Sequence, residues 1–513
     1  MLIKCLMLTV FFAVMIGIGL YCRSHAADVK GFVLGGRNVG PWLTAFAYGT
    51  SYFSAVIFVG YAGQFGWKYG IASTWIGIGN ALIGSMLAWI VLGRRTRIMS
   101  QYLDSATMPE FFGQRFQSRP LKIGASLIIF LFLIPYTASL YNGLSRLFSM
   151  AFSIDYTICI VLMAVFTGIY VIAGGYMATA INDFIQGIIM LIGIAAVIAA
   201  VLCSKGGFMN ALQDLAAVED ASVSSSPGVF ASFFGPDPLS LLSVILLTSL
   251  GTWGLPQMVQ KFYAIRSETA IQTGMIVSTV FALIVAGGCY FLGGFGRLFS
   301  ESIDVAVNGY DSIIPTMLSD LPDVLIALVI ILVLSASMST LSSLVIASSS
   351  TLTIDVIKDN IVADMSEKKQ LTCIRFLIVV FIAVSVVIAI IQYKGNLSFI
   401  AQLMGISWGA LAGSFLAPFL FALYWRKTSL AACWTCFLFG SGVMIANMLF
   451  PQLFPPLLQS PINAGAFVML AGFVIVPVVS LLTPKPDPIF IRHAFACYEK
   501  KVEAAQKLTL GGK

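Results

Sequence analysis

Apolar residues occur along this chain in runs of about twenty, separated by short polar segments. A helix of about that length crosses the hydrocarbon core of a bilayer. The first run has no small-x-small cleavage site after it, so we keep it as a helix rather than a signal peptide. The pattern predicts an all-α, multi-pass membrane protein with about 13 transmembrane helices, at residues 2–22, 41–66, 71–93, 121–150, 156–175, 177–203, 239–262, 270–296, 322–353, 371–393, 398–424, 430–450 and 461–482.

Composition supports this prediction and excludes several functions. The chain is 59% hydrophobic and 10% charged, whereas soluble domains carry about 25% charged residues. The net charge of +7 comes from short clusters between apolar runs, so we expect no nucleic-acid partner. Cys433 and Cys436 form a lone C-x-x-C inside an apolar run, which favours packing over a zinc or redox site.

The basic residues indicate an orientation. Most of the 29 Lys and Arg fall in segments that are cytoplasmic if the N-terminus is outside, and Lys261 is assigned to one of them. We therefore predict a plasma-membrane protein with its N-terminus outside and its C-terminus in the cytoplasm. The tail after residue 482 is too short for a signalling domain, and no phosphate-binding G-x-x-x-x-G-K-[ST] pattern is present.

Two predicted spans carry unusual numbers of hydroxyl groups. Residues 47–60 read A-Y-G-T-S-Y-F-S-A-V-I-F-V-G, a stretch that either unwinds to expose carbonyl oxygens or packs small residues against a neighbouring helix. Residues 334–343 read L-S-A-S-M-S-T-L-S-S, in which Ser335, Ser339, Ser342 and Ser343 share one helical face beside Thr340. Oxygen-rich surfaces of this kind suit a hard cation such as Na⁺, although hydroxyls also bond back to their own helix.

Asp183 is the one acidic residue that we place well inside an apolar run. A carboxylate at that depth needs a cation or a proton. A structural ion pair is the alternative, but we expect no second charge in a nearby span.

Five segments, taken in order, resemble the sodium:solute symporter family over roughly residues 34–424. They are L-G-G-R-N-V-G-P-W at 34–42, P-E-F-F-G-Q-R-F at 109–116, G-G-Y-M-A at 174–178, N-D-F-I-Q-G at 182–187 and S-M-S-T-L-S-S at 337–343. The resemblance implies a leucine-transporter-like core of two inverted five-helix repeats, each beginning with a broken helix. We expect one break at residues 50–54 and the other at 251–256, G-T-W-G-L-P.

The family organisation maps onto the chain as six parts. They are an extra N-terminal helix and linker (1–40), the first repeat (41–203), an external loop (204–238), the second repeat (239–424), two peripheral helices (425–482) and a cytoplasmic tail (483–513).

The resemblance also implies site residues. The main sodium site would consist of Thr50, Phe53, Ala336, Ser339 and Thr340, and a second sodium would use Asp183, Ser339, Ser342 and Ser343. The solute pocket would include Tyr52, Ser54, Val56, Tyr141, Thr252, Trp253 and Gln402. Tyr52, Val56, Thr248 and Thr252 differ from the proline transporters of the family, and no Arg stands near Tyr136 as in sialic-acid members.

We accordingly predict a sodium-coupled symporter that imports a small carboxylate, vitamin or amino-acid-like solute by alternating access. It would act as a monomer in the lipid bilayer, with Na⁺ as coupling ion and no organic cofactor. The alternatives are a proton-coupled transporter of the same fold and a membrane sensor module. No nucleophile–base constellation points to an enzyme.

Overall fold

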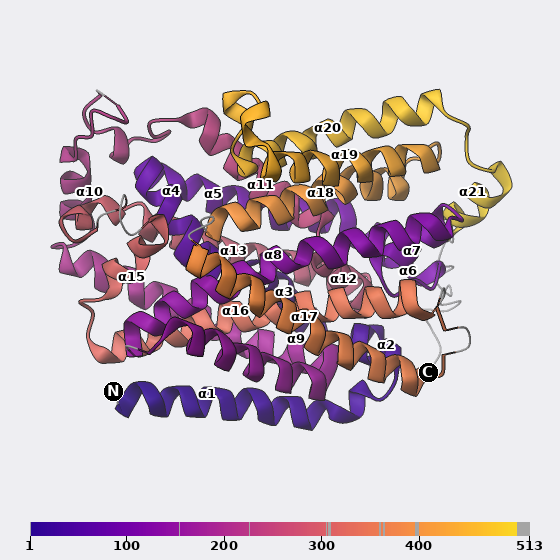
Figure 1. The fold of residues 1–513 in the computed structure, drawn as a ribbon, viewed down its shortest axis with the longest axis horizontal. Coiled ribbons are helices and arrows are strands. Elements are labelled where there is room, and N and C mark those ends of the chain that lie inside the picture. The colour runs from indigo at the N-terminus through magenta and orange to yellow at the C-terminus, as the bar shows by residue number, and fades with distance from the viewer. Residues whose placement is uncertain are drawn as a thin grey trace, which may run out of the picture.

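The computed structural model describes residues 2–152, 154–224, 226–303, 305, 309–358, 361–362, 365–395 and 400–499, without the side chains of residues 2, 24, 25, 52 and 395. Helices dominate this part of the chain, and its only β-type pairings are two isolated bridges. Figure 1 shows the long helices side by side along one axis, with α1 at one edge and α20 at the opposite edge. The all-α prediction is confirmed for these residues.

The helices follow one another in this order along the first half of the chain: α1 (Leu2–Tyr21), α2 (Val29–Leu34), α3 (Pro41–Tyr52), the π-helix η3 (Val56–Tyr61), α4 (Ala62–Tyr69), α5 (Thr74–Gly79), the π-helices η5 (Asn80–Leu87) and η6 (Trp89–Gly93), α6 (Arg94–Tyr102), α7 (Met108–Arg115), α8 (Arg119–Phe152), α9 (Tyr156–Ser204) and α10 (Phe208–Ala217).

The second half contains α11 (Pro238–Gly254), α12 (Pro256–Ala264), α13 (Thr269–Gly293), α15 (Ile313–Leu318), α16 (Asp323–Thr351), the π-helix η10 (Leu352–Lys358), α17 (Glu367–Gly395), α18 (Ile400–Tyr424), α19 (Leu430–Leu449), α20 (Pro461–Leu482) and α21 (Pro488–Phe495). Of the predicted cytoplasmic tail, residues 483–499 are described, and the remainder lies outside the described residues.

Ten helices among the described residues are long and apolar enough to cross a membrane, or eleven if the bent pair α11 and α12 is one span. The sequence prediction of thirteen differs because two runs of helical residues, 56–102 and 156–204, are 47 and 49 residues long and are each counted as one span. A straight helix of 49 residues would measure about 74 Å, more than twice the hydrocarbon thickness. The longer one, α9, is interrupted at Gly175, where φ is 57° and ψ is −153°. The sequence analysis divides α9 into two spans at this glycine.

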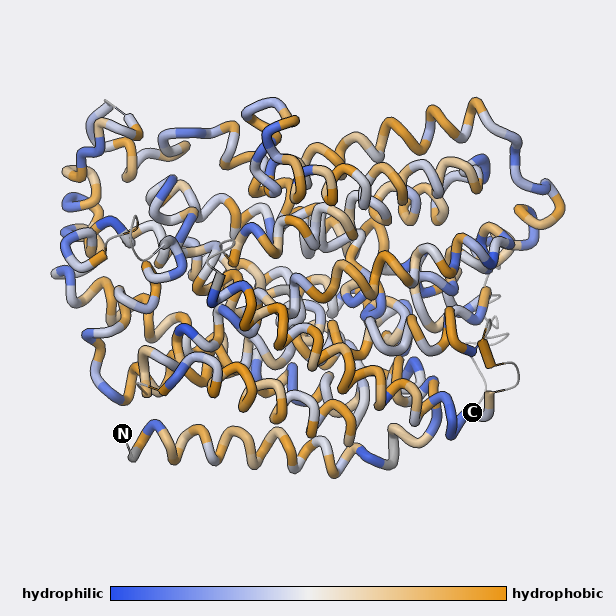
Figure 2. Tube along the Cα trace, viewed as in Figure 1, coloured by the Kyte–Doolittle hydropathy of each residue, from blue (hydrophilic) through white to orange (hydrophobic). Residues whose placement is uncertain are grey.

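Polar and apolar residues are distributed as a bilayer requires. Figure 2 shows hydrophilic residues gathered at the two ends of the bundle and hydrophobic ones along the helices. On α1, the side chains of Ile3, Leu6, Val10 and Val14 form an exposed apolar stripe at helical spacing. Such a stripe is stable against lipid rather than water.

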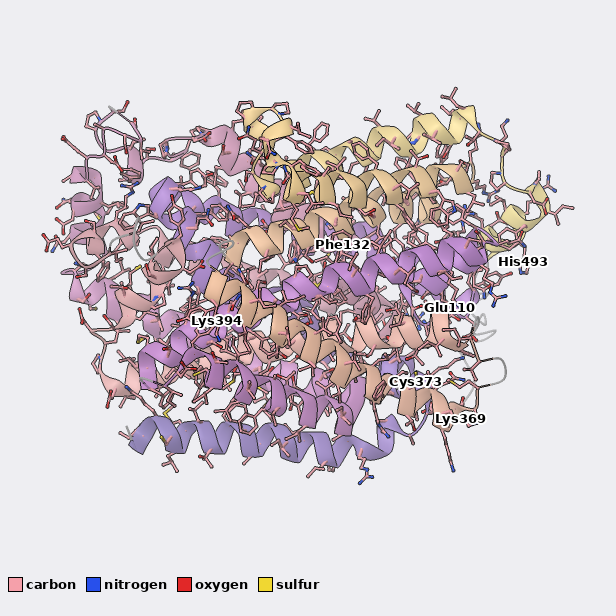
Figure 3. All side chains as sticks on the ribbon, in the orientation of Figure 1. Glu110, Phe132, Lys369, Cys373, Lys394 and His493 are labelled. Carbon is pink, nitrogen blue, oxygen red and sulfur yellow. The ribbon has the colours of Figure 1, made fainter. Side chains whose placement is uncertain are left out.

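Ion pairs join segments that the charge pattern assigns to the same side. At one end are the pairs Lys30–Asp104, Arg94–Glu268 and Arg426–Glu499, and at the other are Lys4–Asp323 and Arg297–Asp220. In Figure 3, Lys369 and His493 lie toward the end of the bundle near α21, and Lys394 lies toward the opposite end. The start of α1 and helix α21 are at opposite ends (Figure 1), as an odd number of crossings requires.

Candidate functional site

The first broken helix ends where the sequence predicts. Helix α3 begins with Pro41 at its first turn and stops at Tyr52, because Phe53 takes an extended conformation with φ −86° and ψ 125°. Helical structure resumes at Ala55 and continues as the π-helix η3. Carbonyl oxygens in the last turn of a helix have no partner four residues on. The carbonyl of Phe53, in the break itself, is also open to other partners.

Helix α16 fills this opening with hydroxyl groups. The Oγ1 atom of Thr340 lies 3.4 Å from the carbonyl oxygen of Thr50, 3.2 Å from that of Phe53 and 3.1 Å from that of Ala336. The Ser339 hydroxyl donates to Thr50 Oγ1 over 2.8 Å. All five residues are buried. The structure therefore brings together all the residues predicted for the main sodium site, which makes an uncharged cluster of oxygen atoms.

The spacing of these oxygens fits a hard cation. The single hydroxyl hydrogen of Thr340 satisfies one acceptor at a time, so its oxygen also faces carbonyl oxygens without a hydrogen between them. Ca²⁺, which prefers the same oxygen ligands as Na⁺, holds them at about 2.3–2.6 Å, which puts ligands at right angles about 3.3–3.7 Å apart. The distances of 3.1–3.4 Å around Thr340 are close to this range. A small cation bound between these oxygens would attract each of them and so offset the repulsion between them.

The second broken helix has a matching geometry. Leu255, with φ −79° and ψ 126°, separates α11 from α12, and the two helices are bent by 47°. A Cβ on Gly251 would lie 2.7 Å from the Trp408 ring, and one on Gly254 would lie 2.8 Å from Ala412 Cα on α18. The break predicted at residues 251–256 is therefore present, and its glycines permit close contact with α18.

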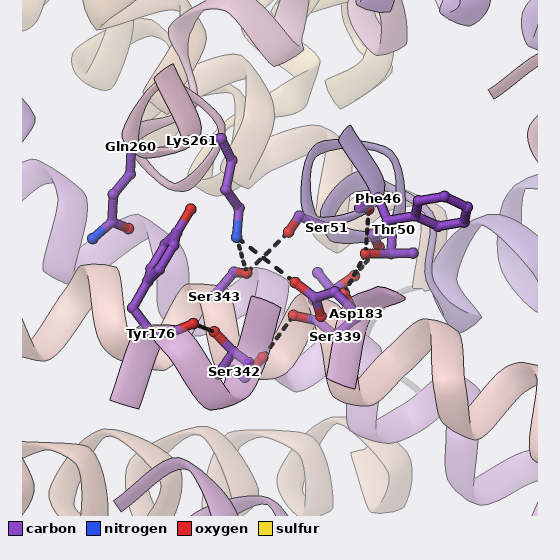
Figure 4. A network of polar contacts seen from close by, with 12 residues as sticks. Phe46, Thr50, Ser51, Tyr176, Asp183, Gln260, Lys261, Ser339, Ser342 and Ser343 are labelled. Atoms are coloured by element: carbon purple, nitrogen blue, oxygen red, sulfur yellow. Dashed lines mark hydrogen bonds and ion pairs between the residues drawn. The ribbon is translucent and has the colours of Figure 1, made fainter. Parts of the chain in front are cut away.

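Asp183 has a charged neighbour that the sequence analysis did not expect. Its carboxylate is fully buried on α9, and Oδ2 lies 3.9 Å from Nζ of Lys261 on α12. Lys261 also donates to the Ser343 hydroxyl over 3.0 Å, and that hydroxyl lies 3.0 Å from Ser51 Oγ (Figure 4). The assignment of Lys261 to a cytoplasmic connection was wrong, as was the expectation of no second charge near Asp183.

A sequence signal for Lys261 was nevertheless present. Gln257, Gln260 and Lys261 stand three and four residues apart, so they share one face of α12, and all three are buried. Three polar residues on one face just after a helix break indicate contacts within the protein rather than with water.

The other hydroxyls of the predicted second sodium site point in different directions. Ser342 donates to the carbonyl of Ser339 over 2.8 Å, so it is bonded back to its own helix. Ser339 is bonded to Thr50, in the main cluster. Ser343 and Asp183 contact a common group, the Lys261 ammonium, and the Ser339 side chain also interacts with the Asp183 carboxylate.

The residues predicted for the solute pocket fall into three places. Ser54, Val56 and Tyr141 are fully buried, Ser54 in the first break and Tyr141 on α8, which meets Ala55 through Gly143. The hydroxyls of Ser54 and Tyr141 have no hydrogen-bond partner among the described residues. The side chain of Tyr52 lies outside the described residues.

Thr252 and Trp253 bind the helix η5 instead of facing the first break. Thr252 Oγ1 donates over 2.9 Å to the carbonyl of Gly84, which also accepts the hydroxyl of Tyr48 over 2.8 Å. Trp253 Nε1 donates to the carbonyl of Ile83 over 2.9 Å. The Gly84 carbonyl of η5 therefore accepts hydrogen bonds from both broken helices, from Tyr48 of α3 and from Thr252 of α11.

Gln402 lies apart from these residues. It is half-buried on α18 and lines a cavity of about 950 Å³, together with Gln64, Lys68, Asp237 and Arg297. The structure does not bring it together with the residues of the first break.

Comparison with known proteins gives a consistent result. Sodium/proline symporters of Staphylococcus aureus strains JH9 and NCTC 8325 are each 29% identical over 495 residues, which is 94% of this chain and 93% of theirs. A Na⁺-coupled sialic acid symporter in a substrate-bound outward-open state has a TM-score of 0.73 at 15% identity, covering 94% of this chain and 99% of that one. A manganese transporter of Eremococcus coleocola has a TM-score of 0.52 at 14% identity, covering 91% and 96%.

At these identities the two structural matches show the fold alone, which is of the leucine-transporter type. The sequence model of the sodium:solute symporter family matches residues 32–440, most of the chain. The sodium/proline symporters that match in sequence are transporters. The long apolar helices are those of a multi-pass membrane protein. This chain therefore belongs to the sodium:solute symporter family.

Proposed function

We propose that this protein imports a small organic solute together with Na⁺, which binds between the break in α3 and the hydroxyls of α16. One observation carries the proposal: the Thr340 hydroxyl lies 3.1–3.4 Å from three carbonyl oxygens in a buried cluster without formal charge. Thr50, Phe53 and Ala336 supply the carbonyls, and Ser339 and Thr340 supply the hydroxyls.

Sodium would act by joining two structural elements. With the ion bound, the break in α3 is held against α16, and the groups of the neighbouring solute site are fixed in place. Binding of each ligand then raises the affinity for the other by the same factor. Separation of α3 from α16 would disperse the ligands and release the ion. Moving one charge through 100 mV supplies about 2.3 kcal/mol, to which the sodium gradient adds.

We infer an architecture of thirteen spans, with repeats at residues 41–203 and 239–424 and the N-terminus outside. The similar backbone conformations at Phe53 and Leu255 support the two repeats. The lengths of the two longest helices support the span count, and the ion pairs at each end support the division of the connections between two sides.

The solute site would lie beside the first break, where Ser54 and Tyr141 offer buried hydroxyls without partners among the described residues. These groups can bind a carboxylate or another hydrogen-bond acceptor, which suits a carboxylate, vitamin or amino-acid-like solute. The named relatives make proline the first compound to test, although Tyr52, Val56 and Thr252 depart from the proline pattern.

A proton-coupled transporter of the same fold is the second candidate. The observation in its favour is Asp183, a fully buried carboxylate that a proton could neutralise. The sodium proposal accounts for more of the polar groups, because the five residues of the main cluster contain no titratable side chain.

An uptake screen tests the proposal. Purified protein in liposomes is given amino acids, monocarboxylates and vitamins, each with an inward gradient of sodium, of potassium or of protons. We expect at least one solute to accumulate with the sodium gradient alone. Accumulation with a proton gradient in sodium-free buffer would instead support the second candidate.

A further inference from the structure

Lys261 is a buried cation whose contacts the main sodium site does not explain. It lies in the last turn of α12, and its side chain is 1% exposed. Nζ donates to Ser343 Oγ over 3.0 Å, lies 3.9 Å from Asp183 Oδ2 and stands 4.9 Å from the centre of the Tyr176 ring. Figure 4 shows the ammonium directed between Ser343 and Asp183. The group therefore links α12 to α9 and α16.

The ammonium stands among the groups that a second sodium would need. Of the four residues predicted for that ion, Asp183 and Ser343 face Lys261 and Ser342 is bonded to its own helix. Ser339 lies beside Asp183 but donates its hydroxyl hydrogen to Thr50. The Ser343 oxygen already accepts a hydrogen from Lys261. A sodium ion added there would share one carboxylate with a second cation in a buried site, which leaves one positive charge uncompensated.

Hydroxyl groups connect this ion pair to the main sodium cluster. Ser343 Oγ lies 3.0 Å from Ser51 Oγ, next to Thr50 on α3. The Ser339 hydroxyl, which donates to Thr50 Oγ1, belongs to the helix α16 that carries Ser343. The position of Lys261 is therefore coupled to the same segment of α3 that supplies the main sodium ligands.

We propose that the Lys261 ammonium is a resident cation that takes the place of a second sodium ion beside Asp183. This inference rests on the proposed sodium-coupled function. It specifies that one sodium ion accompanies each solute, because the Asp183 carboxylate is already neutralised by the chain itself. It also specifies that removing the ammonium while keeping Asp183 creates a second sodium site.

Lys261→Met tests this directly, because it removes the charge and retains a long, apolar side chain. In liposomes, ²²Na⁺ and a labelled solute from the uptake screen are counted in the same samples. We expect one sodium per solute for the wild type and a ratio rising toward two for Lys261→Met, with cooperative sodium dependence. In the double variant Lys261→Met/Asp183→Asn, the ratio should return to one.

Lys122→Met provides a matched control. Lys122 is also a buried lysine, on α8, with Nζ 3.2 Å from Asp355 Oδ1 on η10, a carboxylate outside the sodium cluster. Its loss should lower stability without changing the sodium-to-solute ratio. A ratio that rises equally in both lysine variants would attribute the effect to disturbed packing and would overturn the proposal.

The remaining outcomes are also decisive. A wild-type ratio of two, or an unchanged ratio in Lys261→Met, overturns the resident-cation proposal and leaves sodium coupling intact. Uptake by the wild type that does not require sodium overturns the proposed function itself. If Lys261→Met unfolds on purification, its thermal unfolding is compared in sodium and potassium chloride. Stabilisation by sodium beyond that of the wild type supports the new ion site, and stabilisation by sodium no greater than that of the wild type refutes it.

Discussion

Thr340→Val removes one hydroxyl from the main sodium cluster and keeps nearly the same side-chain shape. In the wild type this hydroxyl contacts the carbonyls of Thr50, Phe53 and Ala336. Removing a buried partner of this kind costs about 1–3 kcal/mol. Since each 1.4 kcal/mol is a factor of ten, we expect sodium to bind roughly 5- to 150-fold more weakly.

Sodium-dependent thermal unfolding measures this loss without knowledge of the solute. At a sodium concentration 100 times the dissociation constant, binding adds about 2.7 kcal/mol to the free energy of unfolding. A thirtyfold weaker site at the same concentration would add about 0.9 kcal/mol. Sodium should therefore raise the unfolding temperature of Thr340→Val much less than that of the wild type, and potassium should raise neither.

Thr351→Val is the matched control on the same helix. Thr351 is equally buried, but its hydroxyl donates to the carbonyls of Ala347 and Ser348 in its own helix. This variant should keep the full sodium response. Equal sodium titrations for Thr340→Val and the wild type would refute the assigned site and would leave the Thr340 face with a packing role.

Three further predictions concern residues outside the main cluster. Asp183→Asn leaves the Lys261 ammonium buried without its carboxylate, so the free energy of unfolding in denaturation assays should fall by about 3–5 kcal/mol. Adding Lys261→Met to the same chain should restore most of that lost stability. Gly254→Ala places a Cβ 2.8 Å from Ala412 Cα, so we expect the free energy of unfolding to fall by about 1–3 kcal/mol and uptake to slow. A melting curve identical to that of the wild type would contradict this expectation. The Ser222 hydroxyl and the Arg297 guanidinium hold the pKa of Asp220 below its ordinary value of 3.8, so this contact stabilises the fold above that pH and is lost as pH falls through the lowered pKa. Asp220→Asn should therefore lower stability at pH 7 by less than about 1 kcal/mol, and the difference from the wild type should vanish in acid.

The helix breaks and the hydroxyl-rich face of α16 could be predicted from the sequence because local chemistry determines them. Pro256 lacks the backbone N–H that a continuous helix requires, and Gly251 and Gly254 allow contact distances that no side chain permits. The hydroxyls of Ser335, Ser339, Ser342 and Ser343 repeat at helical spacing, so they could be assigned to one surface, with Thr340 beside Ser339. The family resemblance then supplied their partners Thr50 and Phe53.

The pairing of Lys261 with Asp183 could not be predicted in the same way. The two residues are far apart in sequence, and their contact depends on how α12 packs against α9. A lysine near the end of an apolar run has the same pattern whether it reaches the cytoplasm or turns inward to a carboxylate. The number of long helices differs from the predicted span count for a related reason, since hydropathy does not show whether helical structure continues through a glycine such as Gly175.

Sodium-driven accumulation in liposomes is the most direct test of the central claim that this chain couples solute import to sodium through the cluster around Thr340. The wild-type protein should concentrate a solute from the screen when sodium is high outside, and should stop when potassium replaces sodium at the same membrane potential. Thr340→Val should need a higher sodium concentration for the same rate, and Thr351→Val should not. Undiminished accumulation in sodium-free buffer driven by a pH gradient would contradict the claim.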